Sequence, residues 1–264
     1  DLHRRRHSFP TRRSSDLEVA PVIGDETPGL AVLVTRNGKV VHMAGYGFAD
    51  LDSEMPITAK SIFDLASVSK EMTALMAAMQ MEEGSYTPET AVEDVLPALG
   101  NGGTDRPLTV GDLLHHIGGL PDYLNGSLDY DEATTNADVV DWLAGEERVA
   151  APGVEFAYSN SGYATLGALV AGVDGAESLG EVLGMRVWGP LGMADTGLLG
   201  PADAGLAVTG TVIGIGDADG VVVVDVPAQV GDHANAAGLG LAGGQHRHFV
   251  EQIAVTVQVR TEVR

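Results

Sequence analysis

Apolar and polar residues alternate near both ends of the chain and follow a helical period between them. In residues 29–49, an apolar run precedes Asn37 and Gly38 and an alternating run follows them; this dipeptide is typical of two-residue turns, so the segment predicts a β-hairpin. In residues 68–83, apolar residues recur at helical spacing up to Gly84, which predicts a buried helix. The stripe consists of Val68, Met72, Leu75, Met76 and Met79. We expect the methionines of this helix to fill the core rather than to bind a ligand: Met72, Met76, Met79 and Met81.

The rest of the chain first follows a helical pattern and then returns to strands. Residues 86–199 contain short helical patterns separated by proline and glycine. After residue 199 the pattern is that of strands, with a turn at Asp217, Asp219 and Gly220 that fits a hairpin better than a calcium loop. The alternation within residues 245–264 is typical of one more strand.

Strands at both ends around a helical middle indicate an α/β (α+β) fold, whose sheet is completed by distant parts of the chain. No internal repeat or long linker divides the sequence. We therefore predict a single domain over residues 18–264, in which residues 27–62 and 200–264 supply the sheet and residues 63–199 are mainly helical.

Charge and composition exclude several classes of protein. The chain has 37 Asp and Glu against 15 Lys and Arg, a formal net charge of −22, which repels nucleic acid and anionic lipid surfaces. It has no Cys, which excludes disulfides, thiolate metal ligands and a cysteine nucleophile. No apolar run approaches the ~20 residues of a membrane-spanning helix. We expect no nucleic-acid partner and no membrane-spanning segment, and the oligomeric state stays open.

The first 17 residues differ from the rest in charge. They hold five Arg and two Asp, and without them ten basic residues remain against 35 acidic ones. The stretch HSFPTRRSSDL resembles a translated sequencing adapter, so we exclude residues 1–17 from the fold as a non-native segment. A basic disordered tail is the alternative. The native start, and with it a cytoplasmic or exported location, stays open.

Ser67 and Lys70 form a Ser-x-x-Lys motif at the start of the first predicted helix. Residues three apart on a helix have β-carbons about 5–6 Å apart, so the Lys70 amine can reach the Ser67 hydroxyl. Helix N-terminal N–H groups also favour an anion that develops nearby. This pattern fits a nucleophile and its proton-transfer partner. The alternative is that Ser67 caps the helix and Lys70 is solvated.

Tyr158 and Asn160 lie in a predicted loop before a helix that starts near residue 164. In an extended loop, residues two apart point to the same side. Tyr158 can then act as a base toward Ser67, while the Asn160 amide binds a substrate carbonyl. The alternative is a packed loop tyrosine with a bonded hydroxyl and an asparagine that makes a turn.

Together with their flanks, these motifs resemble one family. The blocks, in this order, are FDLASVSKEMTA, LLHHIGGLPDY, PGVEFAYSNSGYATLG and WGPLGMADTG. They resemble the class C serine β-lactamase family with its related penicillin-binding proteins, D,D-peptidases and esterases, over about residues 27–244. The resemblance implies an antiparallel sheet flanked by helices, with a helical subdomain and the active site between them.

The resemblance also implies roles for individual residues. Ser67 would be the acyl-enzyme nucleophile, Lys70 its proton-transfer partner, Tyr158 the general base and later acid, and Asn160 a substrate-positioning amide. The expected activity is hydrolysis of a β-lactam, a D-Ala-D-Ala peptide or a small ester, so the expected partner is a small-molecule or peptide substrate. No metal or cofactor is expected. His115 and His116 are adjacent and point apart on a helix, and His42 and His233 are scattered, which does not favour a metal site.

The chain departs from the family in one motif and in its last part. The sequence has no Lys-Thr-Gly or His-Thr-Gly, the family's third motif, which lines the site and supplies part of the oxyanion hole. The family pattern is lost after AAGLGLAGG, so we expect a truncated or frameshifted product in which the C-terminal strands are partly missing. A catalytically impaired fragment or a non-catalytic ligand-binding member is therefore the alternative function.

Overall fold

The structure is a computed structural model, and its described residues form two compact units. It describes residues 23, 29–36, 39–51, 53–58, 60–129, 134–198, 208–209, 211–215, 221–225 and 255–256. The first unit contains the described residues up to Leu65 and the strands between 208 and 225. The second contains residues 66–198 and the strand at 255–256. The basic segment 1–17 and the predicted turn at Asp217 lie outside the described residues.

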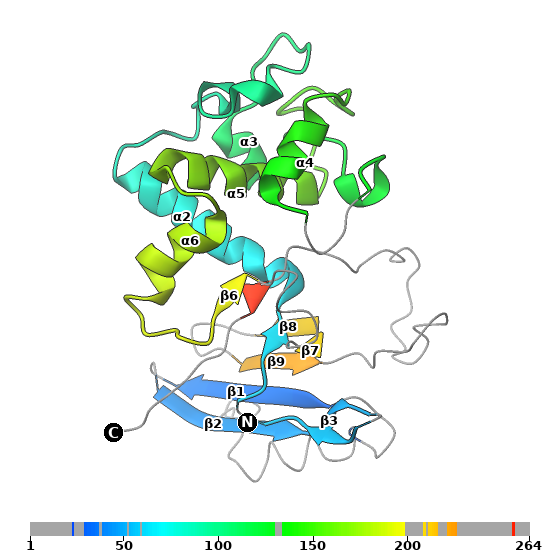
Figure 1. Cartoon of the computed structure of the whole chain (residues 1–264), viewed down its shortest axis with the longest axis vertical. Helices are drawn as coiled ribbons and strands as arrows, with labels where there is room; N and C mark the ends of the chain where they lie inside the picture. The colour runs from blue at the N-terminus through cyan, green and yellow to red at the C-terminus, as the bar shows by residue number, and fades with distance from the viewer. Residues whose placement is uncertain are drawn as a thin grey trace, which may run out of the picture. The chain divides into compact units, whose positions relative to one another are not determined.

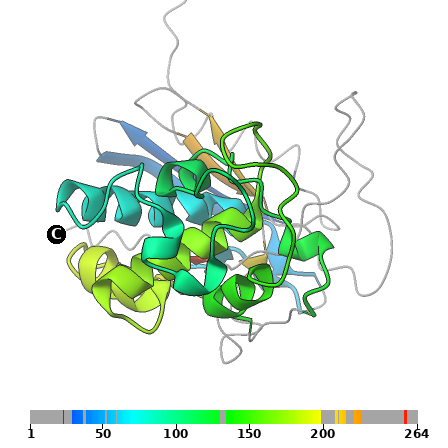
Figure 2. The same cartoon turned by 90° about the horizontal axis from the view of Figure 1, so that it is seen from above.

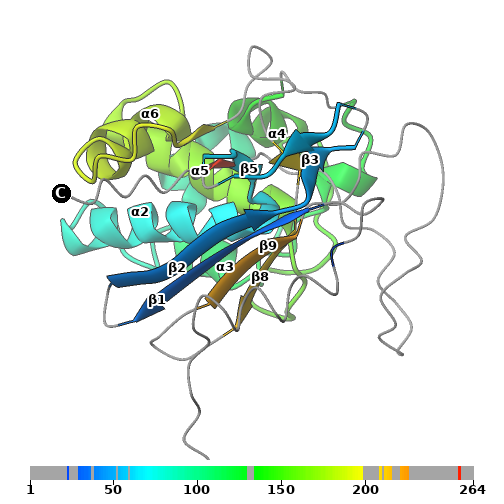
Figure 3. The same cartoon turned by 90° about the horizontal axis from the view of Figure 1, so that it is seen from below.

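The first unit contains a four-stranded antiparallel sheet in the order β2-β1-β9-β8 (Figure 3). Its strands are β1 (Leu30–Arg36), β2 (Lys39–Tyr46), β8 (Thr211–Ile215) and β9 (Val221–Asp225). The predicted N-terminal hairpin is confirmed, because β1 and β2 pair directly, with a register shift between Val34 and Thr35. The pairing of β1 with β9 confirms that the two ends of the chain complete one sheet.

Shorter strands and two small apolar clusters complete this unit. On β1, Leu30, Val32 and Val34 are buried together, as alternation along a strand predicts. Ile57 and Phe63 form the second cluster. The short strands are β3 (Phe48–Asp50) paired with β4 (Met55–Pro56), and β5 (Phe63–Asp64) paired in parallel with β7 (Val208–Thr209).

The second unit is built from helices around one large core (Figure 1). Its helices are α2 (Lys70–Glu82), α3 (Val110–Leu114), α4 (Asn136–Leu143), α5 (Asn160–Asp174) and α6 (Leu179–Leu183). Shorter turns are η1 (Ala66–Ser69), η2 (Val92–Asp94), η3 (Pro97–Leu99), η4 (Tyr123–Asn125) and the π-helical η5 (Gly184–Trp188). Strand β6 (Gly197–Leu198) pairs with β10 (Val255–Thr256), the described part of the last predicted strand.

Helix α5 is the central element of this unit and contacts α2, α3, α4 and α6 (Figure 2). Gly167 permits a close approach of α4, because a β-carbon there would lie 2.4 Å from Asn136 Nδ2. A buried polar contact fixes α2 against α5, since Gln80 Nε2 donates to Val170 O at 3.0 Å and to Asp174 Oδ1 at 2.9 Å. The two helices that begin at the candidate site are therefore held in one register.

The predicted first helix is confirmed, with one difference in which residues it buries. Its four methionines contribute to the core, with Met76 fully buried and the other three partly buried against it. Leu75, expected on the same stripe, is 45 % exposed. Successive residues are about 100° apart around a helix, so a core centred between Met72 and Met76 leaves Leu75 at the edge of the stripe.

Candidate active site

Ser67 lies in the tight turn η1 that leads directly into α2. Ala66 before it has a positive φ of 44°, a conformation that non-glycine residues rarely adopt and that clusters at functional sites. The hydroxyl of Ser69 donates to Ala66 O at 2.5 Å. Ser69, and not Ser67, is the N-cap of α2. The structure therefore does not support the alternative in which Ser67 serves as the helix cap.

Asn160 is the first residue of α5, which begins earlier than the hydrophobic pattern predicts. Ser159 is its N-cap, and the Ser159 hydroxyl accepts the Gly162 N–H at 2.9 Å. The predicted extended loop therefore ends at Ser159, and Tyr158 is its last residue before the cap. Asn160 reaches the site from the helix and not from the loop.

The structure brings Ser67, Lys70, Tyr158 and Asn160 together within hydrogen-bond distance. Ser67 Oγ and Tyr158 Oη are 2.5 Å apart. Lys70 Nζ donates to Ser67 Oγ at 3.4 Å and to Asn160 Oδ1 at 3.0 Å. It also lies 4.9 Å from the centroid of the Tyr158 ring, within cation–π distance. The catalytic roles of the four residues remain a prediction.

Asp122, which the sequence analysis did not single out, orients the Asn160 amide. One carboxylate oxygen, Asp122 Oδ2, accepts both the backbone N–H and the side-chain Nδ2–H of Asn160, each at 3.1 Å. The other oxygen accepts the Leu124 N–H at 3.0 Å. With Nδ2 bound to a carboxylate, Asn160 Oδ1 is the atom that faces Lys70. The only signal in the sequence is that Asp122 lies within the block LLHHIGGLPDY.

His116 packs against the same residues and was considered in the sequence only as a metal ligand. Its ring stacks on Tyr158, with centroids 4.5 Å apart, and on Tyr163, with centroids 4.9 Å apart. Burial lowers the pKa of His116, and the positive charge of the nearby Lys70 lowers it further. Burial, and then the proximity of Tyr158, raise the pKa of Tyr163.

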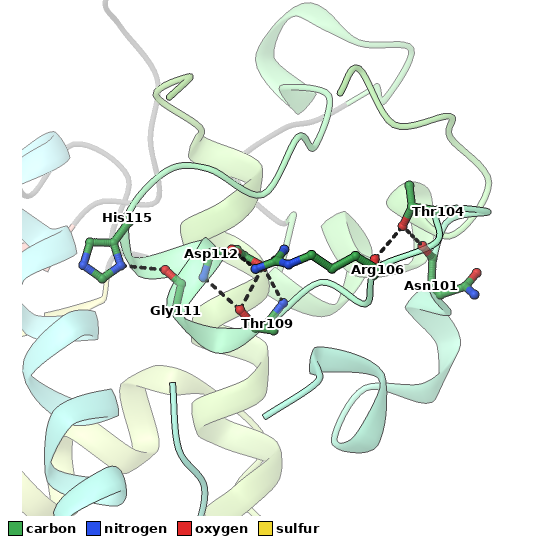
Figure 4. Close-up of polar contacts among 7 residues, drawn as sticks. All are labelled: Asn101, Thr104, Arg106, Thr109, Gly111, Asp112 and His115. Carbon is green, nitrogen blue, oxygen red and sulfur yellow. Dashed lines mark hydrogen bonds and ion pairs between the residues drawn. The ribbon is translucent and has the colours of Figure 1, made fainter. Parts of the chain in front are cut away.

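Helix α3, which ends just before His116, is anchored at its start (Figure 4). Arg106 binds the buried Asp112 carboxylate through two nitrogens, at 2.8 and 2.9 Å. Thr109 and Asp112 form a reciprocal capping box. Figure 4 shows that the neighbouring His115 is bonded within its own helix, where Nδ1 lies 2.8 Å from Gly111 O.

A small cavity of about 40 Å³ lies beside Lys70 and Asn160, and Asn136 contributes to its lining. The buried Asn136 Oδ1 has no hydrogen-bond partner, so the cavity has the size and polarity for ordered water. Within the described part of the chain, no group of three or more His, Asp or Glu is placed to hold a metal ion. None of the described helices combines the length and apolarity needed to cross a bilayer.

Comparison with known proteins places the chain among serine β-lactamases and penicillin-binding proteins. Penicillin-binding protein 4* of Bacillus subtilis (strain 168) is 31 % identical over 167 residues, which cover 61 % of this chain and 36 % of that protein. The chain spans about a third of the length of the curated relatives it matches.

Solved structures confirm the expected β-lactamase/transpeptidase-like fold. A class C β-lactamase has a TM-score of 0.60 and 26 % identity, over 71 % of this chain and 51 % of that one. D-amino acid amidase from Ochrobactrum anthropi SV3, complexed with L-phenylalanine, has a TM-score of 0.60 and 25 % identity, over 76 % and 55 %.

The family model named Beta-lactamase matches residues 16–250, most of the chain. The family resemblance inferred from the sequence is thereby confirmed. This protein belongs to the β-lactamase family, alongside penicillin-binding proteins and class C β-lactamases.

Proposed function

We propose that this protein is a serine hydrolase that forms an acyl-enzyme on Ser67. The observation that carries the proposal is the 2.5 Å contact between Ser67 Oγ and Tyr158 Oη, with Lys70 Nζ 3.4 Å from the same Ser67 oxygen. A nucleophile bonded to a base, with a third group orienting the pair, is the arrangement that activates a serine hydroxyl. In this protein, the arrangement is formed by residues at the start of α2 and by a residue just before α5.

In the proposed acylation step, Ser67 Oγ attacks the carbonyl carbon of the substrate while its proton moves to Tyr158 Oη. The proton acceptor in this step is the ionised Tyr158 oxygen, whose negative charge the Lys70 ammonium, 4.9 Å from the centroid of the Tyr158 ring, stabilises until the Ser67 proton neutralises it. Tyr158 then gives the proton to the leaving group as the bond between it and the carbonyl carbon breaks. Deacylation reverses these roles, with water in place of the leaving group.

Asp122 and Asn160 position Lys70 in this scheme. Asn160 Oδ1 accepts from Lys70, and one N–H of Nδ2 donates to Asp122, so the lysine is held by a fixed amide. The second N–H of Nδ2 is suited to a substrate carbonyl, the role that the family resemblance implies for Asn160. Backbone N–H groups at the start of α2 are suited to the oxyanion.

The proposed substrates share a carbonyl carbon that the Ser67 hydroxyl can attack. A β-lactam or a D-Ala-D-Ala peptide fits the likeness to a penicillin-binding protein and a class C β-lactamase. The likeness to D-amino acid amidase extends the proposed range to amides, and a small ester is included because it offers the same kind of carbonyl carbon. The proposed reaction requires no metal or cofactor.

A second candidate function is ligand binding without turnover. It is favoured by one observation, the absence of Lys-Thr-Gly or His-Thr-Gly from the sequence. Loss of one oxyanion-hole donor costs about 2.7–4 kcal/mol of transition-state stabilisation, roughly a 10²- to 10³-fold loss of rate. A protein with the geometry described above and without that motif would then bind a substrate and acylate slowly.

Two covalent probes separate these functions. The folded protein is treated with a fluorescent penicillin and, separately, with a fluorescent fluorophosphonate, and the labelled residue is located by peptide mass spectrometry. We expect label on Ser67 and none in Ser67→Ala, while Ser69→Ala, which alters a nearby hydroxyl bonded to Ala66, keeps it. Absence of label with both probes from folded protein contradicts the hydrolase proposal and supports a binding function.

A further inference from the structure

His116 contacts three consecutive residues of the loop that leads into α5. Its carbonyl oxygen accepts the Ala157 N–H at 2.8 Å. Its ring stacks on Tyr158 with an angle of 28° between the planes. Its Nδ1 accepts the Ser159 N–H at 3.1 Å. The backbone on both sides of Tyr158 and the Tyr158 ring itself are thus fixed by one residue.

We propose that His116 is a positioning residue for Tyr158, that it acts only in its neutral form, and that proton uptake by His116 releases Tyr158 from Ser67. This proposal rests on the proposed function of Ser67 and Tyr158. A backbone N–H can only donate, so the contact with Ser159 requires an Nδ1 without a proton. A protonated imidazole carries hydrogens on both nitrogens and would place two donors against each other at that contact.

The charged and titratable groups around His116 oppose a positive ring. Lys70 of α2 is the nearby cation, and its Nζ lies 4.9 and 5.8 Å from the ring centroids of Tyr158 and Tyr163, the two tyrosines that stack on His116. The carboxylates of the segments on either side of His116 have other partners, since Asp112 binds Arg106 and Asp122 binds Asn160.

Burial and the Lys70 charge both lower the pKa of His116 and so support the neutral form at neutral pH. Acidification must therefore overcome the Lys70 charge and break the Ser159 contact.

The backbone of His116 decides which substitutions are informative. Its φ is +57°, a left-handed conformation that asparagine tolerates better than most residues. His116→Asn therefore keeps an acceptor near the place of Nδ1, lacks the ring and cannot titrate. His116→Phe keeps a ring for Tyr158 and lacks the acceptor. His115→Asn is the matched control, because His115 is exposed and bonded to Gly111.

The first test measures the rate at which a fluorophosphonate labels Ser67 between about pH 7.5 and pH 5. We expect the wild-type rate to fall about 10-fold or more over this range, and His115→Asn to follow it. His116→Asn should be slower at the upper pH but lose this dependence, and His116→Phe should be slow throughout, with circular dichroism reporting that each variant is folded. A wild-type pH profile in both His116 variants overturns the proposal.

The second test does not depend on activity. The ring protons of His116, assigned by their absence from the spectrum of His116→Asn, are followed by NMR as the pH is lowered. We expect a midpoint below about 6.5, with the Tyr158 ring signals shifting at the same midpoint. Tyr158 signals that do not follow His116 contradict the positioning role, even in a protein that no probe labels. Absence of label on wild-type Ser67 at every pH would instead count against the proposed function alone.

Discussion

Tyr158 and Tyr163 both stack on His116, but their hydroxyl groups have different partners. Tyr158 Oη lies 2.5 Å from Ser67 Oγ, whereas Tyr163 Oη donates to the backbone oxygen of Leu114 at 3.2 Å. Tyr158→Phe should lower turnover of a small ester by about 10²-fold or more, because it removes the proposed base and keeps the ring. Tyr163→Phe, measured in the same ester assay, should have a much smaller effect. Equal losses in the two variants would remove Tyr158 from the mechanism.

Asp122 acts on Lys70 through Asn160, so its substitution should mainly affect the chemical step. Asp122→Asn replaces an oxygen that accepts two N–H groups of Asn160 with an amide that cannot accept both in the same way. We expect kcat for an ester substrate to fall about 10-fold or more with little change in KM. Asp141→Asn, on the exposed face of α4, is the control. A change confined to KM would contradict the positioning role.

The site could be predicted from sequence only where its residues are close together in the chain. Ser67 and Lys70 share a helical turn, and Tyr158 and Asn160 share one block, so local spacing made each pair a candidate and the family resemblance joined the two pairs. Asp122 and His116 contact Asn160 and Ser159, which are distant from them in sequence. No local pattern encodes those contacts, so their roles became visible only in the structure.

At the scale of elements, the N-terminus of α5 links stability to the site. Ser159→Ala removes the cap bond to Gly162 and should lower the free energy of unfolding by about 1 kcal/mol in urea titrations. Ser178→Ala removes the equivalent cap of α6 and should cost about the same. Only Ser159→Ala should also reduce ester turnover, because Tyr158 and Asn160 flank that cap. Similar losses of turnover in both variants would contradict a specific effect of the Ser159 cap on the site.

Hydrophobic periodicity predicted the elements well where burial shapes the pattern. The hairpin of β1 and β2 and the helix α2 agree with the prediction, because each buries one regular face. The start of α5 was missed, since its first turn is fixed by the Ser159 hydroxyl and contains polar and glycine residues that carry no apolar period. Leu75 is exposed because the buried face of α2 is narrower than the apolar pattern of the sequence indicated.

For the whole molecule, all four predicted site residues and both positioning residues belong to the unit formed by residues 66–198. Their contacts depend on packing within that unit, chiefly of α5 against α2 and α3. The proposed nucleophile Ser67 and the residues around it therefore lie within a single helical unit. The single domain predicted for residues 18–264 stays a prediction.

The pH dependence of unfolding should show two acidic phases. The pKa of His116 is lower when folded, so the unfolded chain takes up the proton first, and stability falls as the pH drops below about 6.5. Although burial opposes it, hydrogen bonds from Arg106 and Thr109 lower the pKa of Asp112, and bonds from Thr135 lower that of Asp138. Their contribution is present above about pH 3.9 and is lost as the pH falls further.

Thermal unfolding followed by circular dichroism across this pH range checks both phases. His116→Asn should lose the first phase and keep the second. If the loss of stability below about pH 6.5 is as large in His116→Asn as in the wild type, that loss comes from other titratable groups.

Acylation of Ser67 is visible in the intact mass of the protein shortly after mixing with an activated acetyl ester. We expect wild-type protein to gain the mass of one acetyl group, located on Ser67 by peptide fragmentation and lost again with time as water hydrolyses it. Tyr158→Phe should gain it more slowly and Ser67→Ala should not gain it. Ester turnover that is unchanged in folded Ser67→Ala, or an acetyl adduct that this variant carries equally, would contradict acylation of Ser67.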